Sequence, residues 1–342
     1  MNKTYKVVIS PGDGVGHEII GWAQKTLETV AQIEGGFRFD FMSVDIGFGA
    51  YQKTGEALSK ACLDAMRSAD ATLFVAMAAA EIPKHVPNPI RVMRRELNLY
   101  AIVRESRDYP KLAPPGRKAD LVVVRESTEG FFSGIEYMVG PDSACAVRVI
   151  TRKSSERIAR VAFRIAQGRR KKVTAIHKAT AHKLSDGLFL EAVEKVQKEE
   201  FPGIELEKML VDGAAAHLVR NPAHFDVILA TSAYGDILAD EAAEITGGIG
   251  LASSADIGDK IAVFEPCHGT APDITGKGIA NPIATLLSAK LMLDYLGQKR
   301  AGMRIQSAVE RVIEKGEVLT PDMGGKGTTN QIGQAIIEEL GK

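Results

Sequence analysis

The fold class is decided by Lys6-Val-Val-Ile-Ser-Pro-Gly-Asp-Gly-Val-Gly16, which joins an apolar run to an amphipathic segment through a glycine-rich turn. Lys6–Ser10 has the length and apolar character of a buried strand, and the helical period after the turn predicts a helix from Gly16 to about Ile33. A strand, a short glycine-rich loop and a helix in this order form the repeating unit of an α/β fold.

The same unit recurs along most of the chain. Phe37, Phe39 and Phe41 alternate with polar neighbours, as in a half-buried strand. Further strands are predicted at Ala71–Ala76, Leu121–Arg125, Lys172–Ile176, Val227–Ala230 and Ile261–Phe264. Helical patterns lie between them at Ser59–Ser68, Ile90–Leu99, Ser155–Gln167, Asp186–Lys198 and Pro282–Tyr295. The alternation predicts a largely parallel sheet with functional loops at the strand ends.

One stretch departs from this alternation. Phe131–Thr151 lacks a helical period and mixes glycine with apolar residues, which predicts a projecting β arm. The length of 342 residues suggests about two domains. Because the sequence has no long polar linker, we expect two domains to share one continuous sheet.

Charge and cysteine content exclude several classes of protein. Lys plus Arg and Asp plus Glu both number 43, so no global field favours nucleic acid or an anionic membrane. The apolar stretch near the N-terminus ends at Pro11 and is too short for a signal peptide or a spanning helix. Cys62, Cys145 and Cys267 are far apart and odd in number, which favours a reducing cytoplasm over a disulfide framework.

Two aspartates suggest a metal site. Asp236 and Asp240 are four residues apart in a predicted helix, so their carboxylates share one face. Asp212, after an apolar run, is a possible third ligand, and Mg²⁺ or Mn²⁺ favours such an all-oxygen set. The alternative is that the two helical acids only answer the positive end of the helix dipole.

Arginines gather around the predicted helix that begins near residue 90. Arg91 and Arg94 lie on one face of it, Arg104 follows, and Arg125 ends a strand. Guanidinium groups bind carboxylates bidentately, so converging arginines suit a di- or tricarboxylate substrate. The alternative is a solvated basic face, which we prefer for Arg95.

Lys178 and two loops complete the candidates. Lys178 ends a strand, where a nearby metal and arginines could depress its pKa so that it acts as a base, whereas its neighbour His177 is more often structural. The loop at 11–16 does not fit the dinucleotide fingerprint. The loop Glu265–Ile274 is either a structural turn or a cofactor loop in which Asp273 accepts the ribose hydroxyls of NAD and repels the 2′-phosphate of NADP.

Taken together, the motifs resemble the isocitrate, isopropylmalate and homoisocitrate dehydrogenase family of β-decarboxylating enzymes, and most of all its homoisocitrate and NAD-isocitrate members. The resemblance covers nearly the whole chain. The matching motifs are Pro11–Gly16, Arg94-Arg-Glu-Leu-Asn-Leu-Tyr-Ala101, Val123-Val-Arg-Glu-Ser-Thr-Glu-Gly130, Ile176-His-Lys-Ala179, Gly235-Asp-Ile-Leu-Ala-Asp240, Glu265-Pro-Cys-His-Gly-Thr-Ala-Pro-Asp-Ile274 and Gly276-Lys-Gly-Ile-Ala-Asn-Pro282.

The resemblance implies a non-Rossmann, isopropylmalate-dehydrogenase-like α/β fold of two domains with a continuous mixed sheet and a β-arm clasp. Residues 1–98 plus 249–342 would form the large cofactor-binding domain. Residues 99–248 would form the small domain, with the dimer interface and the arm at about 131–151.

The same resemblance implies the roles of individual residues. Substrate carboxylates would meet Arg94, Arg104 and Arg125, with Lys178 as base or proton relay. Mg²⁺ or Mn²⁺ would be held by Asp212, Asp236 and Asp240. Lys178 and Asp212 would come from the opposite subunit of a homodimer. NAD would contact His268, Gly269, Thr270, Ala271, Asp273, Ile274 and Asn281.

Substrate choice in this family depends on the start of the arginine helix. Arg91 corresponds to the extra arginine that meets the distal carboxylate in homoisocitrate enzymes, where isopropylmalate enzymes have apolar residues. Asn88 stands near a substrate serine of isocitrate enzymes. The resemblance therefore implies oxidation of homoisocitrate or isocitrate by NAD followed by decarboxylation, with a related acidic 3-substituted malate as an alternative.

The chain also departs from the family pattern. Phe132 replaces the tyrosine that protonates the enolate, and phenylalanine has no proton to give. Ser127 and Thr180 replace asparagines, Gly213 replaces the asparagine after Asp212, and Val75–Glu81 lacks the usual hydroxyl residue. These departures leave a regulatory or ligand-binding homologue as a second hypothesis. A third is an enzyme that oxidises without rapid decarboxylation, or that uses Tyr137 or water as the acid.

Overall fold

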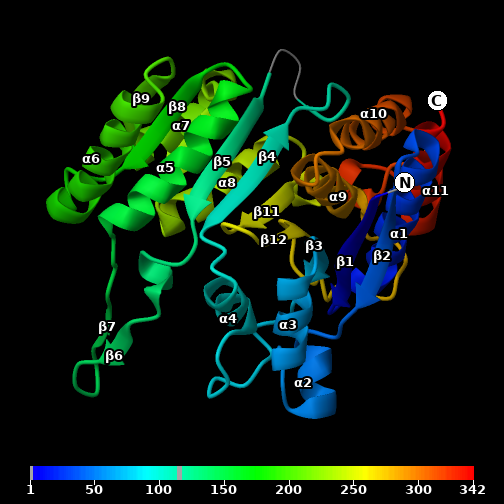
Figure 1. Cartoon of the computed structure of the whole chain (residues 1–342), viewed down its shortest axis with the longest axis horizontal. Helices are drawn as coiled ribbons and strands as arrows, with labels where there is room; N and C mark the ends of the chain where they lie inside the picture. The colour runs from blue at the N-terminus through cyan, green and yellow to red at the C-terminus, as the bar shows by residue number, and fades with distance from the viewer. Residues whose placement is uncertain (1–2, 114–117) are drawn as a thin grey trace.

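The computed structural model describes residues 3–113 and 118–342. In this part of the chain, one large sheet runs through the molecule (Figure 1). Its strands are β1 (Lys3–Gly12), β2 (Phe37–Ser43), β3 (Ala71–Ala76), β4 (Ala101–Arg107), β5 (Asp120–Glu126), β8 (Lys172–His177), β9 (Glu205–Leu210), β10 (Val227–Ala230), β11 (Ser253–Ile257) and β12 (Ala262–Pro266). Their spatial order is β2-β1-β3-β12-β11-β4-β5-β10-β8-β9.

The sheet is mixed, and its antiparallel part lies in the middle. β11 pairs antiparallel with β12 and β4, and β4 pairs antiparallel with β5, whereas the pairs toward both ends of the sheet are parallel. The predicted continuous mixed sheet is confirmed, and the expectation of a largely parallel sheet holds only outside its centre. The reason is local: residues 258–261 form a tight turn, closed by Gly258 N donating to Ile261 O, which sends β12 back along β11.

Helices cover the sheet. They are α1 (Gly16–Glu34), α2 (Phe48–Thr54), α3 (Lys60–Ser68), α4 (Pro89–Glu96), α5 (Arg152–Gln167), α6 (Lys183–Glu200), α7 (Val211–Arg220), α8 (Ser232–Ile245), α9 (Ile283–Tyr295), α10 (Lys299–Lys315) and α11 (Thr329–Leu340). The six helices predicted by residue range are confirmed within a few residues at each end. None of the helices in the described ranges combines the length and apolar character that a membrane crossing needs.

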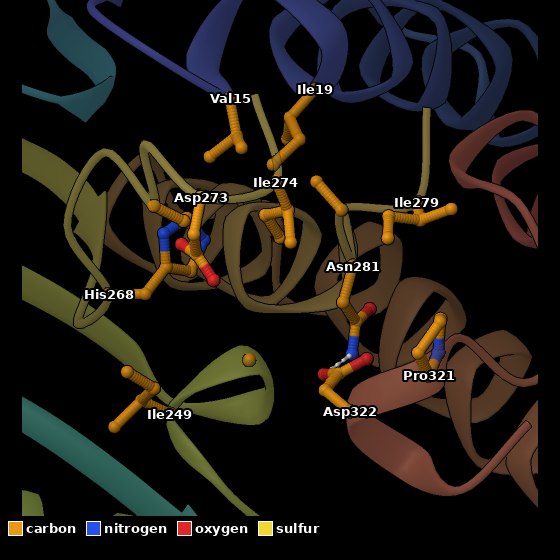
Figure 2. A pocket seen from close by; sticks show the side chains of 13 residues that line it. Val15, Ile19, Ile249, His268, Asp273, Ile274, Ile279, Asn281, Pro321 and Asp322 are labelled. Atoms are coloured by element: carbon orange, nitrogen blue, oxygen red, sulfur yellow. Dashed lines mark hydrogen bonds between the residues drawn. The ribbon is translucent and has the colours of Figure 1, made fainter. Parts of the chain in front are cut away.

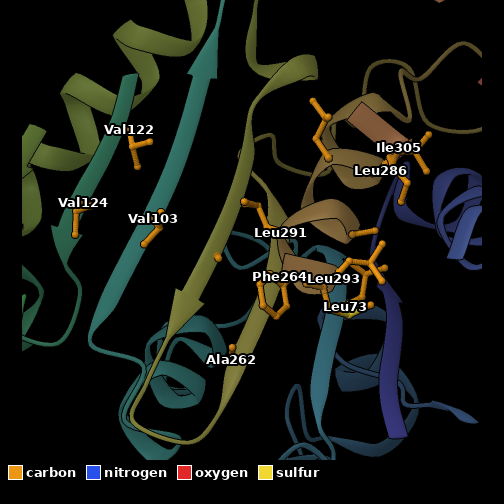
Figure 3. Packing of buried hydrophobic residues seen from close by; sticks show 14 of the residues in the cluster. Leu73, Val103, Val122, Val124, Ala262, Phe264, Leu286, Leu291, Leu293 and Ile305 are labelled. Atoms are coloured by element: carbon orange, nitrogen blue, oxygen red, sulfur yellow. The ribbon is translucent and has the colours of Figure 1, made fainter. Parts of the chain in front are cut away.

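The main core lies between the sheet and the helices formed by both ends of the chain (Figure 3). Phe264 of β12 and Leu73 of β3 are buried against α9, whose residues Leu286 and Met292 are fully enclosed. Helix α9 is apolar on nearly all sides because α10 covers the face that the sheet leaves free. The two ends of the chain therefore lie together, at the right of Figure 1.

The predicted division into two domains maps onto this one sheet. The strands of residues 1–98 and 249–342 form one half of it, and the strands of residues 99–248 form the other half. Because no linker separates the halves, the exact domain boundaries stay a prediction.

The predicted β arm is present. β6 (Glu136–Met138) and β7 (Ala144–Ala146) pair antiparallel, and the hairpin projects away from the body of the protein (Figure 1). A bridge between Gly130 and Val149 closes its base. Apolar residues at its end are exposed, with Met138 at 61% and Val139 at 57%.

The loop between β1 and α1 is a structural joint. The Asp13 carboxylate accepts hydrogen bonds from the backbone N–H groups of Phe48, Gly49 and Ala78, each at 2.8 Å. Gly14 has a φ of +59°, and a Cβ there would lie 2.2 Å from the carbonyl oxygen of Thr270. The glycine thus lets this loop lie directly against the Glu265–Ile274 loop.

Candidate functional site

The predicted substrate arginines meet around one cavity of about 230 Å³. Arg94 reaches it from α4, Arg104 from β4 and Arg125 from the end of β5. Its wall also includes Asp236 of α8 and the start of the 265–274 loop. Segments far apart in the sequence converge here because β4, β5, β11 and β12 are neighbours in the sheet.

Two buried acids hold Arg94 in place. Its Nε lies 2.6 Å from an oxygen of Asp256, and its Nη2 lies 3.1 Å from Glu265. Burial raises the pKa of Glu265 to about 7, and the neighbouring charge of Asp256 adds to the shift. No sequence pattern indicates Asp256, because β11 is a short segment of small and polar residues. The sequence places Glu265 only at the start of the predicted cofactor loop and not beside Arg94.

Arg104 and Arg125 meet the acids of α8. Arg104 lies 2.5 Å from Asp240 and 3.7 Å from Asp236, and Arg125 lies 2.9 Å from Asp236. Burial lowers the pKa of Arg125 to about 10; Asp236 opposes this shift, whereas Arg94 and Arg104 add to it.

Several of these donors have no partner. Within residues 3–113 and 118–342, the Nε of Arg104 and the Nε and Nη1 of Arg125 are buried without a hydrogen bond. Since a buried, unpaired guanidinium donor is costly, the cavity is prepared for an anion with several oxygen atoms. Burial also raises the pKa of the Cys267 thiol in the same wall to about 12, so this thiol stays protonated.

Arg91 and Asn88 lie outside this cavity. Asn88 caps α4, accepting hydrogen bonds from the backbone N–H groups of Ile90 and Arg91 at 3.0 and 3.2 Å, so its predicted position near substrate coexists with a structural role. Arg91 is exposed and approaches the arm, because a Cβ on Gly134 would lie 2.8 Å from its Nη1. Arg95 is exposed, as expected for a solvated position.

The predicted metal ligands separate into two places. Asp236 and Asp240 are inside α8 and not in its first turn, which contradicts the alternative that they only answer the helix dipole. Asp212 lies in the first turn of α7, and its carboxylate forms an ion pair of 2.6 Å with Lys178. Among the described residues of one chain, no three His, Cys, Asp or Glu side chains are arranged to hold a metal ion.

Lys178 is held by a buried acid that the sequence analysis did not identify. Asp186 is fully buried and accepts a hydrogen bond of 2.6 Å from the backbone N–H of Lys178. Its other oxygen forms an ion pair of 2.6 Å with Arg148, at the base of the arm. The Arg148 guanidinium lies over the rings of Phe131 and Tyr234. The arm, α6 and α8 are thereby connected around the lysine.

A second cavity has a volume of about 310 Å³, and Figure 2 shows the residues that line it. Val15 and Ile19 of the β1–α1 joint form part of its wall. The predicted NAD residues His268, Ala271, Asp273, Ile274 and Asn281 line it; Gly269 lines the first cavity, and Thr270 is not a lining residue of either. Asn281 donates to Asp322 at 2.9 Å, and Asp322 also lines the cavity, although no sequence motif indicated it.

His268 connects the two cavities, because it lines both. Burial lowers its pKa, so the ring is neutral at physiological pH, and its Nε2 is buried without a partner. A ligand in the second cavity could therefore extend past His268 and meet a molecule held by the three arginines.

Phe132 is a neighbour of Arg125, although it is not a lining residue of the arginine cavity. It lies in the short helical turn Phe131–Ser133, and its ring centre is 5.5 Å from the guanidinium carbon of Arg125. The residue that breaks the family pattern is thus next to a predicted substrate arginine.

Comparisons with known proteins agree with this geometry. The family model described as isocitrate/isopropylmalate dehydrogenase matches residues 6–336. An isocitrate/homoisocitrate dehydrogenase of Thermus thermophilus is 44% identical over 344 residues, with 98% of each chain covered. A 3-isopropylmalate dehydrogenase of Archaeoglobus fulgidus is 42% identical, covering 98% of this chain and 99% of the relative. The crystal structure of isocitrate dehydrogenase from Methylococcus capsulatus superposes with a TM-score of 0.92 at 38% identity, covering 99% of this chain and 100% of the other.

Proposed function

Because this chain belongs to the isocitrate/isopropylmalate dehydrogenase family, we propose that it oxidises and decarboxylates an isocitrate-like 2-hydroxy acid, homoisocitrate or isocitrate, using NAD and Mg²⁺ or Mn²⁺. One observation carries this proposal: Arg94, Arg104 and Arg125 converge on a cavity that retains unpaired guanidinium donors. Sequence identity to relatives does not identify the substrate. Two relatives named for different substrates differ by only 2 percentage points in their identity to this chain.

The arginines support a substrate with more than one carboxylate. Arg104 and Arg125 keep unpaired donors inside the cavity. Arg91 is on the same helix as Arg94 but lies outside the cavity. A third carboxylate at the end of a longer substrate could reach Arg91, as in homoisocitrate. A related acidic 3-substituted malate is the alternative that the same cavity would accept.

The residues fit a hard divalent cation. Asp236 and Asp240 present carboxylate oxygens on one face of α8, and their side chains are 37% and 60% exposed, so they are accessible to an ion. When bound, the metal would polarise the substrate oxygen and stabilise the charge that develops there. A bound cation would also compensate the charge of these two acids. Arg104 and Arg125, which now pair with them, would then have more donors for substrate carboxylates.

The second cavity fits the adenosine part of NAD. Asp273 offers an acceptor for ribose hydroxyls. Because Nδ1 of His268 donates to the carbonyl oxygen of Gly269, its Nε2 offers an acceptor to an N–H group such as the amino group of adenine. The negative charge of Asp273 disfavours the 2′-phosphate of NADP. The bound cofactor would supply the hydride acceptor next to the arginine cavity.

We further propose that two copies of the chain complete each site. In one chain, Lys178 and Asp212 pair with each other, and neither is a lining residue of the arginine cavity. Exposed apolar residues on the arm, such as Tyr137 at 54%, and on α8, such as Ile237 at 69%, offer surfaces for a second copy. Lys178 of one protomer would then take the hydroxyl proton of a substrate held by the arginines of its partner.

The three cysteines are all free, which fits our assignment to the cytoplasm.

A panel of 2-hydroxy di- and tricarboxylates tests the activity. We expect NADH formation with homoisocitrate or isocitrate in the presence of Mg²⁺ or Mn²⁺, and little NADPH formation with NADP. Absorbance at the reduced nicotinamide band measures both. If no member of the panel reduces either cofactor, the proposed activity is wrong.

Phe132 favours one second candidate, a ligand-binding homologue with impaired catalysis. Its ring lies beside Arg125 without a group that can donate a proton. This candidate predicts that calorimetry detects metal-dependent binding of isocitrate to a protein that does not turn it over.

The contact between Asp186 and Lys178 yields a separate prediction. Asp186→Asn is expected to lower kcat by about 10- to 100-fold with KM changed by less than about twofold, because the lysine loses part of its positioning while the arginine cavity stays intact. Steady-state kinetics measure the two constants, and thermal unfolding monitors the fold. Glu191→Gln is the matched control, since Glu191 is on the same helix in an exposed ion pair with Arg152. An unchanged kcat would mean that other contacts position Lys178.

A further inference from the structure

A third cavity, of about 250 Å³, shares no wall residue with the two described above. It lies where the end of α1 meets α10 and the last residues of the chain, on the part of the molecule that Figure 1 shows at the right. Its residues are Glu34, Arg300, Met303, Arg304, Ser307, Arg311 and Lys342.

Four of its residues form a stripe on α10. Arg300, Arg304, Ser307 and Arg311 are separated by three, four or seven residues, so they lie on one face of the helix. Lys315 continues this face by one turn. The stripe therefore presents four cationic side chains along one line.

Two buried glutamates orient the cations. The negative charge of each glutamate is compensated by its ion pairs with them. The Glu34 side chain is 8% exposed; it accepts a hydrogen bond from Nε of Arg304 at 2.7 Å and forms an ion pair of 2.8 Å with Nε of Arg300. Glu339 is 4% exposed and binds the Nε of Arg311 at 2.9 Å and the ammonium group of Lys315. Hydrogen bonds from Lys315, Lys342 and Arg311 lower the pKa of Glu339 to about 2.

The remaining hydrogen-bonding groups are almost all donors. Arg304 and Arg311 give further hydrogen bonds to the carbonyl oxygens of Leu340 and Glu339. In the part of the chain that the structure describes, Nη2 of Arg304 and Nη1 of Arg311 donate no hydrogen bond. The same holds for both Nη atoms of Arg300, whose side chain is 82% exposed, and for the Ser307 hydroxyl. The stripe thus has four cations, and only the carboxylates of Glu34 and Glu339 pair with them. Lys342, the last residue of the sequence, is not included in this count.

We propose that this cavity binds a small diphosphate anion. The Cα atoms of Arg304 and Arg311 lie about 10 Å apart along the helix axis. Donors carried on side chains at this spacing suit two linked phosphoryl groups better than a single carboxylate. Phosphoryl oxygens also point in several directions, which suits donors that arrive from successive turns of one helix. The cavity is smaller than the range of about 300–1,000 Å³ for drug-sized ligands, so it would enclose a diphosphate and little more.

Ser307 offers a test that keeps the fold intact. In Ser307→Asp, a carboxylate of the protein itself would occupy the donors, whereas Ser307→Asn has nearly the same shape and no charge. Calorimetry with inorganic pyrophosphate in metal-free, low-salt buffer measures binding to the full-length protein. We expect saturable binding to the parent, a Kd raised at least about tenfold in Ser307→Asp, and a Kd within about threefold of the parent in Ser307→Asn.

Other outcomes would overturn the proposal. Binding that Ser307→Asp leaves unchanged would place the pyrophosphate elsewhere, for example on the arginines of the substrate cavity. The absence of saturable binding to the parent would show that the stripe is only a solvated ion-pair network. Orthophosphate and citrate are run beside pyrophosphate, and tighter binding of citrate would overturn the choice of a phosphoryl ligand. A raised thermal midpoint of Ser307→Asp without any anion would support the proposal, because the new carboxylate would then pair with the stripe.

Discussion

Lys178→Met is expected to lower kcat by about 10²- to 10⁴-fold, the usual contribution of a positioned general base. Methionine has a similar length but cannot accept a proton from the substrate hydroxyl, while the arginine cavity, the proposed substrate site, is untouched. The measurement is the initial rate of NADH formation with the best substrate of the panel. KM is expected to change by only a few-fold.

Lys178→Arg separates the base from its charge. The guanidinium group keeps the positive charge beside Asp212 but does not lose its proton near neutral pH, so this variant should be as inactive as Lys178→Met. If Lys178→Arg retained near-parental activity, Lys178 would act only through its charge. If both variants were fully active, the proposed role of Lys178 would be wrong.

Mixing two inactive chains tests whether a second copy completes the site. Lys178→Met and Asp236→Asn alter one residue outside the lining of the arginine cavity and one residue of its wall. If each site takes Lys178 from one protomer and Asp236 from the other, a mixed dimer has one site with both changes and one intact site. Random assembly of equal amounts should then restore about a quarter of the parental activity. No recovery in verified mixed dimers would mean that each site uses residues of one chain.

Phe132→Tyr is expected to raise the rate of CO2 release by about tenfold or more. The ring stands 5.5 Å from the Arg125 guanidinium carbon, and a phenol there could donate the proton that phenylalanine cannot. The measurement is CO2 release beside NADH formation, because a slow protonation step would uncouple the two in the parent.

Two further variants make this result specific. Phe131→Tyr adds a hydroxyl to the neighbouring ring, which is 46% exposed and lies near Arg148, so it should leave the rate unchanged. Tyr137→Phe should slow the parent if Tyr137 is the surrogate acid. An unchanged rate in Phe132→Tyr would show that the proton already arrives by another route.

The sequence predicted most of the regular structure on the sheet's outer parts. Apolar runs of strand length and amphipathic helices are local patterns, and β3, β10 and α5 appear within a few residues of their expected places. It did not predict β11, because Ser253–Ile257 contains small and polar residues that are buried only by their neighbours β4 and β12. Helices α10 and α11 were also not predicted.

By itself, the sequence determined the fold class, the family and the kinds of residue available for acidic substrate, metal and cofactor. These follow from local periodicity and from motifs whose residues are close together in the chain. The tertiary structure decided which of them meet. It paired Arg94 with Asp256 and Glu265, gathered the three arginines around one cavity, and paired Lys178 with Asp212 outside the lining of that cavity. The physical reason is that such contacts depend on which strands become neighbours in the sheet, and no local pattern of side chains records that order.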